Sequence, residues 1–491
     1  MVFNKTTKQL FIFLFLLLFI SCGDDIQKTK QIDNNFTSDT IKAKKNIVIN
    51  FDLNDIIKRD TLKAITVYSP TSYFIYKGTP MGFEYDLLNR LAKDIGVELE
   101  IVVAHNIDEM FELLNSGKGD IIAYGMTITE KRKQEVSFTK PYMNIHQVLV
   151  QKKPDNWRKL TTEQIQKQLI TNVTKLANKK ISVRKNSSYY ERLVHLSEEI
   201  GSEIIIDTVS GELSTDDLIN LVSQGKIKYT ISDDNIAKVS SMYYPNLDIN
   251  TSVSLSQNLA WVVRKSSVDL LNILNKDIDR IVGSKNYNIT YNKYFKNKRQ
   301  YAKRVGNEFF SKETGKISKY DNLIKKYADK IDWDWLLLCS QIYQESRFIN
   351  NDKSWAGAGG LMQIMPKTAR ELGISNVHNP EQNIQAGTKY LKIIWKRWED
   401  IPDSLQRIKF TLASYNCGYH HVRDAQFLTK KYNKNNLSWD NGVDEYILKL
   451  SKPKYYNRKG IEYGYVRGNE PYNYVKDIFV RYKIYKDLIK E

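Results

Sequence analysis

The stretch Trp335-Leu-Leu-Leu-Cys-Ser-Gln-Ile-Tyr-Gln-Glu-Ser-Arg-Phe348 predicts a buried helix that carries a carboxylate on an apolar face. At helical spacing Glu345 lies on the same face as Leu338 and Ile342. Burial disfavours the charged form of a carboxyl, so we expect the pKa of Glu345 to be raised. A carboxyl that stays protonated near neutrality is suited to act as a general acid. We therefore predict that Glu345 is a catalytic acid.

Three further blocks follow this helix in order. They are Ala356-Gly-Ala-Gly-Gly-Leu-Met-Gln-Ile-Met-Pro366, Ala413-Ser-Tyr-Asn-Cys-Gly418 and Asn469-Glu-Pro-Tyr-Asn-Tyr-Val475. Together with the Glu345-Ser346 pair, they resemble the motifs of lytic murein transglycosylases that have the soluble-transglycosylase, lysozyme-like domain. The order of four blocks makes this resemblance specific, whereas a Glu-Ser dipeptide alone would carry no weight. The resemblance implies an all-α, lysozyme-like domain at residues 321–491.

The same resemblance implies roles for the matched residues. Glu345 protonates the glycosidic oxygen. The expected substrate-binding residues are Ser346, which orients the Glu345 carboxyl, Met362 and Gln363, which line the cleft, and Tyr415, Asn416 and Tyr474, which lie near the carboxyl and the substrate. This chain departs from the family at Pro471, where the family has a threonine.

A hydrolase of this type needs a second carboxylate, which the matched blocks do not supply. Glu371 and Glu381 lie in segments predicted to be on the surface, and Glu470 belongs to the last block. This favours the transglycosylase route, in which one group acts first as acid and then as base. We therefore expect a peptidoglycan lyase that cleaves the MurNAc–GlcNAc β-1,4 bond and leaves 1,6-anhydromuramoyl ends, with no cofactor.

Strands and helices alternate over residues 48–298, which predicts two α/β lobes with largely parallel sheets. The predicted strands are 62–68, 97–103, 120–124, 180–183, 203–207, 228–232 and 259–263. The predicted helices are 83–95, 107–116 and 215–224, with another from Ser188.

Four motifs in this region resemble the periplasmic solute-binding proteins of the polar amino-acid type. They are Gly82-Phe-Glu-Tyr-Asp-Leu87, Asn115-Ser-Gly-Lys-Gly-Asp-Ile-Ile122, Gly125-Met-Thr-Ile-Thr-Glu-Lys-Arg132 and Val136-Ser-Phe-Thr-Lys-Pro-Tyr142. The resemblance implies a two-lobed, periplasmic-binding-protein-like domain at residues 48–298. Residues 299–320 are charged and form the expected junction to the catalytic domain.

The solute-binding resemblance implies a site for an amino acid or a muropeptide. Arg132 takes the α-carboxylate through a bidentate fork, and Asp233 meets the α-ammonium. Thr127, Thr129 and Ser187 supply further donors. An alternative stays open, in which these are surface and capping residues of a domain that has lost its ligand.

The N-terminus resembles a bacterial lipoprotein signal at residues 1–22. Lys5 and Lys8 precede an apolar run from Leu10 to Ile20, and Phe19-Ile-Ser-Cys22 resembles a lipobox whose cysteine carries the lipid. Residues 23–47 are polar and form the expected flexible tether. We expect an outer-membrane lipoprotein of the cell envelope that faces the periplasm, and Asp24-Asp25 resembles a signal for surface exposure. An ordinary signal peptide is the alternative.

The net charge of +18 suits an anionic polymer such as peptidoglycan. The lysines are scattered, and export removes nucleic acid as a partner. Cys339 and Cys417 are expected to be buried thiols, with a disulfide between them as the alternative. No cluster in the sequence suggests a metal site.

The order of the two domains resembles the membrane-bound lytic transglycosylase F group. Two other functions stay open. One is a muramidase that hydrolyses with water. The other is a solute-binding receptor whose C-terminal domain binds glycan without cutting it.

Replacing the expected lipidation site tests the anchor. Cys22→Ser removes the only thiol to which the lipid can be attached in the lipobox, so the protein should leave the membrane fraction and lose acyl labelling. Fractionation and labelling with a radioactive fatty acid measure both effects. Unchanged labelling of the variant would contradict the anchor.

Overall fold

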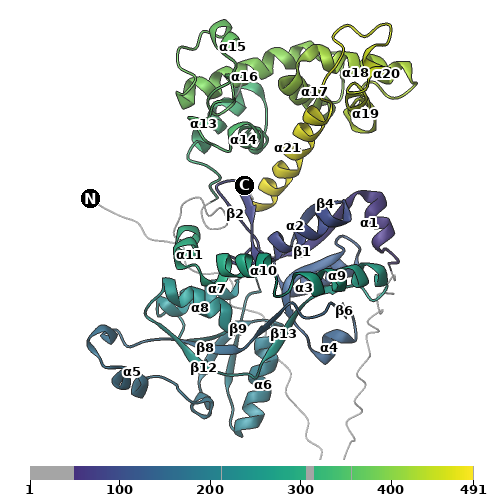
Figure 1. Cartoon of the computed structure of the whole chain (residues 1–491). Coiled ribbons are helices and arrows are strands. Elements are labelled where there is room, and N and C mark those ends of the chain that lie inside the picture. The colour runs from purple at the N-terminus through teal and green to yellow at the C-terminus, as the bar shows by residue number, and fades with distance from the viewer. Residues whose placement is uncertain (1–48, 212, 306–314, 355, 490–491) are drawn as a thin grey trace, which may run out of the picture. The chain divides into compact units, whose positions relative to one another are not determined.

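The computed structural model describes residues 49–211, 213–305, 315–354 and 356–489. Two α/β lobes lead the described chain and an all-helical domain ends it, which confirms the predicted fold class (Figure 1). The expected signal peptide, its Cys22 and the tether lie outside the described residues.

The sheet of the first lobe has the strand order β4-β1-β5-β13-β6, with β7 also paired to β13. These strands are β1 (Thr61–Thr66), β4 (Glu98–Val103), β5 (Ile121–Thr127), β6 (Ser137–Phe138), β7 (Met143–Ile145) and β13 (Gln257–Val263). β1 runs parallel to β4 and β5, whereas β13 returns antiparallel to β5. The helices of this lobe are α1 (Leu53–Arg59), α2 (Phe83–Ile95), α3 (Ile107–Asn115), α4 (Glu130–Lys133), α9 (Val268–Ile281) and α10 (Lys285–Tyr291).

The second lobe has the strand order β10-β9-β11-β8-β12. Its strands are β8 (Gln147–Lys152), β9 (Lys180–Arg184), β10 (Ile205–Val209), β11 (Tyr229–Asp233) and β12 (Leu247–Ser252). Its helices are α5 (Thr162–Gln168), α6 (Ser188–Ile200), α7 (Thr215–Ser223) and α8 (Asp234–Tyr243). β9, β10 and β11 are parallel, but β8 and β12 run antiparallel to their neighbours, so the sheets are less parallel than predicted.

One glycine of the solute-binding motifs has a clear steric reason. Gly82 precedes α2 with φ 150°, and a Cβ there would lie 1.9 Å from the carbonyl oxygen of Ser72. No side chain fits at this position, so the backbone enters α2 along a path that only glycine allows.

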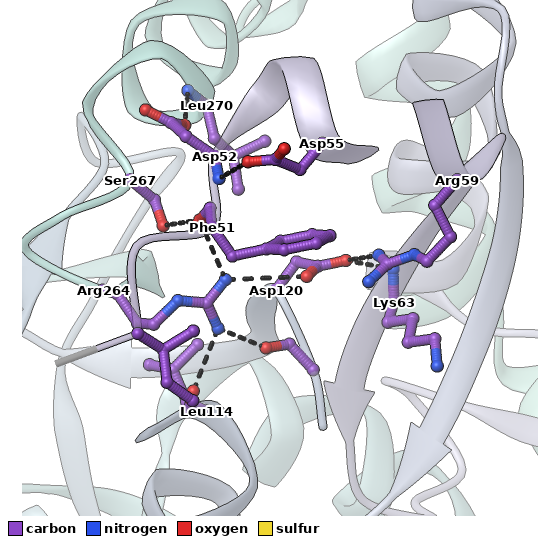
Figure 2. Close-up of polar contacts among 12 residues, drawn as sticks. Phe51, Asp52, Asp55, Arg59, Lys63, Leu114, Asp120, Arg264, Ser267 and Leu270 are labelled. Carbon is purple, nitrogen blue, oxygen red and sulfur yellow. Dashed lines mark hydrogen bonds and ion pairs between the residues drawn. The ribbon is translucent and has the colours of Figure 1, made fainter. Parts of the chain in front are cut away.

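A buried ionic network ties the start of the described chain to the first lobe (Figure 2). Asp120 is fully buried, pairs with Arg59 and accepts the backbone N–H of Lys63 at 2.8 Å. Arg264 lies 3.6 Å from Asp120 and donates to the carbonyl oxygen of Leu114 at 2.9 Å. The network therefore joins α1, β1, α3 and the segment before α9.

The C-terminal domain packs its helices around α14 (Trp335–Ser346), which is buried along most of its length. The other helices are α13 (Asp321–Ala328), α15 (Pro366–Glu371), α16 (Pro380–Arg397), α17 (Ser404–Cys417), α18 (Tyr419–Lys431), α19 (Asp444–Lys449), α20 (Pro453–Tyr456) and α21 (Asn469–Leu488). Leu338 and Ile342 are fully buried, as the helical spacing predicted.

The expected junction contains a helix, α11 (Lys298–Val305). Its Tyr301 is buried, and its hydroxyl lies 3.0 Å from Ser240 Oγ on α8. The first part of the junction thus packs on the second lobe.

Removing the charge of Asp120 should loosen the first lobe. Asp120→Asn leaves the buried Arg264 guanidinium without its carboxylate, and breaking a buried pair in this way costs about 3–5 kcal/mol. We expect about hundredfold faster hydrogen exchange in β1 and β5, because about 1.4 kcal/mol changes an opening equilibrium tenfold. Mass spectrometry of peptides measures this.

Asp155→Asn is the matched control, because its pair with Lys152 lies at the surface and should not affect β1 or β5. Unchanged exchange in Asp120→Asn would contradict a stabilising role for the network.

Candidate functional site

Glu345 lies in the last turn of α14, and the helix ends at Arg347 in the left-handed conformation. The side chain is partly buried, and this burial raises the pKa of Glu345 to about 7. Tyr474 Oη on α21 donates a hydrogen bond to Glu345 Oε1 at 2.5 Å. The raised pKa agrees with the expectation from the apolar face, and the carboxyl is available in both protonation states near neutral pH.

Tyr474 is oriented by a buried glutamine that the sequence analysis did not single out. Gln341 Nε2 donates to Tyr474 Oη at 3.2 Å, and Gln341 is fully buried. Because the phenol oxygen accepts this bond, its own proton is directed to Glu345. Gln341 lies one turn before Glu345 on α14, so the helical spacing was the available signal.

The glycine-rich block folds tightly against α16. Gly360 has φ +78°, and a Cβ there would lie 2.1 Å from the carbonyl oxygen of Val377. The fully buried Asn383 receives the Met362 N–H at 2.7 Å and donates to the Gly359 carbonyl at 3.0 Å. Asn383 thus holds the loop in place, a role that the sequence analysis missed.

The prediction that Met362 lines the cleft is wrong. Its side chain is fully buried, and a Cβ on Gly387 would lie 2.2 Å from its sulfur, so the thioether fills the core beside a glycine of α16. Met362 contributes its backbone instead, because its carbonyl oxygen accepts a bond from Tyr415 Oη at 2.8 Å. Ser346 Oγ donates to the Leu361 carbonyl at 2.8 Å, so it braces α14 against the loop and does not bond to the Glu345 carboxyl.

The remaining matched residues are Gln363 and Asn416. Gln363 has φ 48°, a left-handed conformation that non-glycine residues rarely adopt, and donates to the Gly360 carbonyl at 2.9 Å. Asn416 is exposed in an open depression beside Tyr474. The depression is lined by Gln344, Asn416, Asn469, Glu470, Asn473 and Tyr474.

No second carboxylate supports Glu345 within the described chain. The causes of its raised pKa are burial and, in the opposite direction, the Tyr474 hydrogen bond. Glu470 is exposed and pairs with Arg467 at 3.3 Å, and Glu381 pairs with Lys326 at 2.7 Å. Glu470 also lines the depression, but it is exposed and paired, so Glu345 is the carboxyl of the site that burial prepares for proton transfer.

The two lobes enclose a cavity that contains four of the five predicted ligand residues. Thr127, Arg132, Ser187 and Asp233 line it, whereas Thr129 caps α4 and lines the neighbouring groove. The lobes touch here, because Thr127 Oγ1 lies 3.1 Å from Ser188 Oγ and Arg132 Nη2 donates to the Asn186 carbonyl at 3.5 Å. The cleft is closed in this structure.

Asp233 ends β11 and faces this cavity. Burial raises its pKa to about 7, and the hydroxyl of Tyr189 hydrogen-bonds to it. Ser187 begins α6 and donates to the Arg184 carbonyl at 2.7 Å, so its hydroxyl is occupied by the backbone. The sequence analysis missed Arg184 and Tyr124, which also line the cavity. For Arg184 the available signal was its position at the carboxyl end of the parallel strand β9, whereas Tyr124 lies in the middle of β5.

These features define a class of protein: a two-lobed solute-binding domain followed by a lytic transglycosylase domain. The profile of bacterial extracellular solute-binding proteins, family 3, matches residues 62–297, and that of the transglycosylase SLT domain matches residues 322–438.

Relatives match both domains together. A membrane-bound lytic murein transglycosylase F of Desulfosudis oleivorans is 35% identical over 86% of this chain and 89% of its own length. One of Aliivibrio fischeri is 32% identical over 87% of this chain and 83% of its own length. The chain belongs to the membrane-bound lytic murein transglycosylase F family. A crystal structure of ArgBP from T. maritima, 27% identical, covers 50% of this chain and 99% of its own, with TM-score 0.42.

Three other sequence expectations concern thiols, metals and the membrane. Cys339 and Cys417 are free thiols. Within the described ranges, no group of three or more His, Cys, Asp or Glu is placed to hold a metal ion. Among the same residues, no helix has both the length and the apolar composition to span a bilayer.

Removing the hydroxyl of Tyr474 should change both the rate and its pH dependence. A lost hydrogen bond to a charged group costs about 1.5 kcal/mol or more, so Tyr474→Phe should lower turnover about tenfold or more. The Tyr474 bond lowers the pKa of Glu345, so its loss raises that pKa. The protonated form of Glu345 is lost as the pH rises through this pKa. The alkaline limb of the pH–rate profile should therefore move to higher pH in Tyr474→Phe.

Turnover of purified peptidoglycan at a series of pH values measures both effects. Tyr482→Phe on the same helix is the control, because it removes a hydroxyl bonded to a different carboxylate, Asp334. An unshifted alkaline limb in Tyr474→Phe would contradict the role of Tyr474 in setting the pKa of Glu345.

Proposed function

We propose that the catalytic domain cleaves the MurNAc–GlcNAc β-1,4 bond of peptidoglycan and leaves 1,6-anhydromuramoyl ends, with Glu345 as both acid and base. The observation that carries the proposal is the isolation of this carboxyl. It has a pKa of about 7, one phenol donor and no carboxylate partner among the described residues. A group that titrates near the working pH can both give and recover a proton.

In the proposed reaction Glu345 carries out both proton transfers. Protonated Glu345 gives its proton to the glycosidic oxygen, and the bond between this oxygen and C1 of the muramoyl residue breaks as oxocarbenium character develops. The Glu345 carboxylate, stabilised by Tyr474, then takes the proton of the muramoyl 6-hydroxyl, whose oxygen bonds to C1. No water is consumed, and Glu345 ends in its starting state.

Glu345→Gln tests this role. The amide is nearly isosteric but cannot give and recover a proton, so turnover should fall at least about 10²-fold while glycan binding is retained. Glu371→Gln is the control, because Glu371 is exposed on α15 and should keep wild-type turnover. Turnover and the masses of the products measure the outcome.

Activity retained by Glu345→Gln would remove Glu345 from the mechanism. Wild-type products with reducing ends, one water heavier than anhydro ends, would instead identify a hydrolytic muramidase.

The proposal extends to the N-terminal domain, which we take to bind an amino acid or a muropeptide. Arg132 and Asp233 face the same cavity from opposite lobes and supply a cation for a carboxylate and a carboxylate for an ammonium. Calorimetry should show saturable heat that Arg132→Ala abolishes.

Regulation of the enzyme by this ligand is part of the proposal. The hairpin of β2 (Phe74–Tyr76) and β3 (Thr79–Met81) contacts helices of the catalytic domain. Tyr485 Oη donates to the Gly78 carbonyl at 3.0 Å, and Thr79 Oγ1 lies 2.8 Å from Tyr343 Oη. Tyr343 precedes Glu345 by two residues on α14, which gives a lobe movement a route to the catalytic helix.

We also propose that a lipid on Cys22 attaches the protein to the outer membrane, facing the periplasm. The lipobox-like end of the apolar segment and the membrane-bound relatives support this location.

The pKa of Asp233 predicts how ligand binding depends on pH. An ammonium ligand needs the ionised carboxylate, whereas the unliganded group is mostly protonated below pH 7. The affinity for the ligand should therefore be about tenfold lower at pH 6 than at pH 8. Calorimetry at both values measures it, and Asp233→Asn should bind weakly with no such dependence. Affinity that rises toward pH 6 would contradict the assignment of Asp233.

A further inference from the structure

A second arginine faces the cavity of the N-terminal domain. Arg184 ends β9, and Asp233 ends β11, the neighbouring parallel strand, so both lie at the same edge of the sheet. Both side chains are buried, and Arg184 is only 3% exposed. Arg132 reaches the cavity from the other lobe. Two guanidinium groups and one carboxylate therefore line a single closed cleft.

Arg184 has no acidic partner in the described structure. Its Nη1 donates to Tyr124 Oη at 3.3 Å and its Nη2 donates to the Gly211 carbonyl at 3.2 Å, which are both neutral acceptors. Its Nε is buried and has no hydrogen-bond partner. A guanidinium has five N–H donors, and burial of an unpaired charge is costly. The side chain is thus prepared for an anion that the described residues do not provide.

Neither arginine neutralises Asp233. The groups that act on the Asp233 carboxyl are Tyr189 and Asp234, beside burial. The carboxylate of Glu191, at the rim of the cleft, acts on the pKa of Arg132 but forms no ion pair with it within the described chain. The ionisable groups that line the cavity, apart from tyrosines, therefore leave an excess of one positive charge: Arg132, Arg184 and Asp233.

We propose that the ligand of this domain is a small α-amino acid with a second carboxylate, which Arg184 binds. This rests on the proposed function of the cleft, in which Arg132 takes the α-carboxylate and Asp233 takes the ammonium. A ligand with two carboxylates and one ammonium balances the three charged groups that line the cavity one for one. The second carboxylate accepts the free Nε–H of Arg184 and replaces the Tyr124 phenol as a partner.

A structural role for Arg184 alone does not account for its charge. The bond to Gly211 holds the segment before α7, and a neutral amide could make it equally well. The position also differs from a surface arginine, because the side chain is buried between the lobes and faces the ligand residues.

Isosteric amino-acid pairs test the second carboxylate on the wild-type full chain. L-glutamate is compared with L-glutamine and L-aspartate with L-asparagine, because each pair differs in charge and hardly in size. Calorimetry at pH 8 should show that one acid binds at least about tenfold tighter than its amide, the gain expected when a charged acceptor meets a buried guanidinium. Equal affinities, or tighter binding of the amides, would overturn the inference while leaving amino-acid binding in place.

Heat from none of the four compounds would also overturn the inference. Titration of a muropeptide then tests the proposed ligand site itself, so the two failures are distinguishable. Arg184 variants assign the effect to this residue. Arg184→Gln should remove the preference for the acid, whereas Arg184→Lys should keep a preference because it keeps the charge. A full preference for the acid in Arg184→Gln would exclude Arg184 as the binding group.

Discussion

The catalytic domain depends on one interaction, the hydrogen bond from Tyr474 to the partly buried Glu345. Burial alone raises the pKa of Glu345 and favours the acid, whereas the phenol stabilises the carboxylate that follows proton transfer. The two effects together place the pKa of Glu345 near neutrality, and in the proposed mechanism this allows Glu345 to act first as the acid and then as the base. The surrounding structure holds these two side chains in place. Gln341 aligns the phenol, and α21 packs along α14. Asn383 and Ser346 fix the loop that borders them.

The cleft of the N-terminal domain also contains charged groups that are shielded from solvent. Asp233 in this cleft is buried, and we propose that it and the two arginines bind charged groups of a ligand. Arg132 and Arg184 face Asp233 without pairing to it, and polar side chains of the two lobes meet directly at Thr127 and Ser188. If the domain binds the proposed ligand, lobe–lobe bonds are exchanged for ligand bonds, and the free energy of binding can be transmitted by movement of the lobes. The β2–β3 hairpin bonds to Tyr343 and Tyr485, and in the proposed regulation it is the contact that would carry such a movement to the enzyme.

Sequence reasoning was most successful where a local pattern determines structure. The helix at Glu345 and its raised pKa followed from spacing and apolar neighbours, and the strands at β1, β4, β9 and β11 followed from short apolar runs. It failed where the outcome depends on tertiary packing. Met362 belongs to a matched motif, but its side chain fills space left by Gly387, which is distant in sequence. β8 and β12 were missed because their pairing is set by strands elsewhere in the sheet. The partners of Arg184 and Gln341 likewise come from other elements.

The central claim is that a single carboxyl cleaves the glycan without water, and cleavage in H₂¹⁸O tests it most directly. Closure by the muramoyl 6-hydroxyl takes no oxygen from solvent, so the new ends from the wild-type enzyme should contain no ¹⁸O when they are analysed by mass spectrometry. A hydrolase places one solvent oxygen on C1 of each new end. Incorporation of one ¹⁸O per cleavage would contradict the account and would require a second catalytic group beside Glu345.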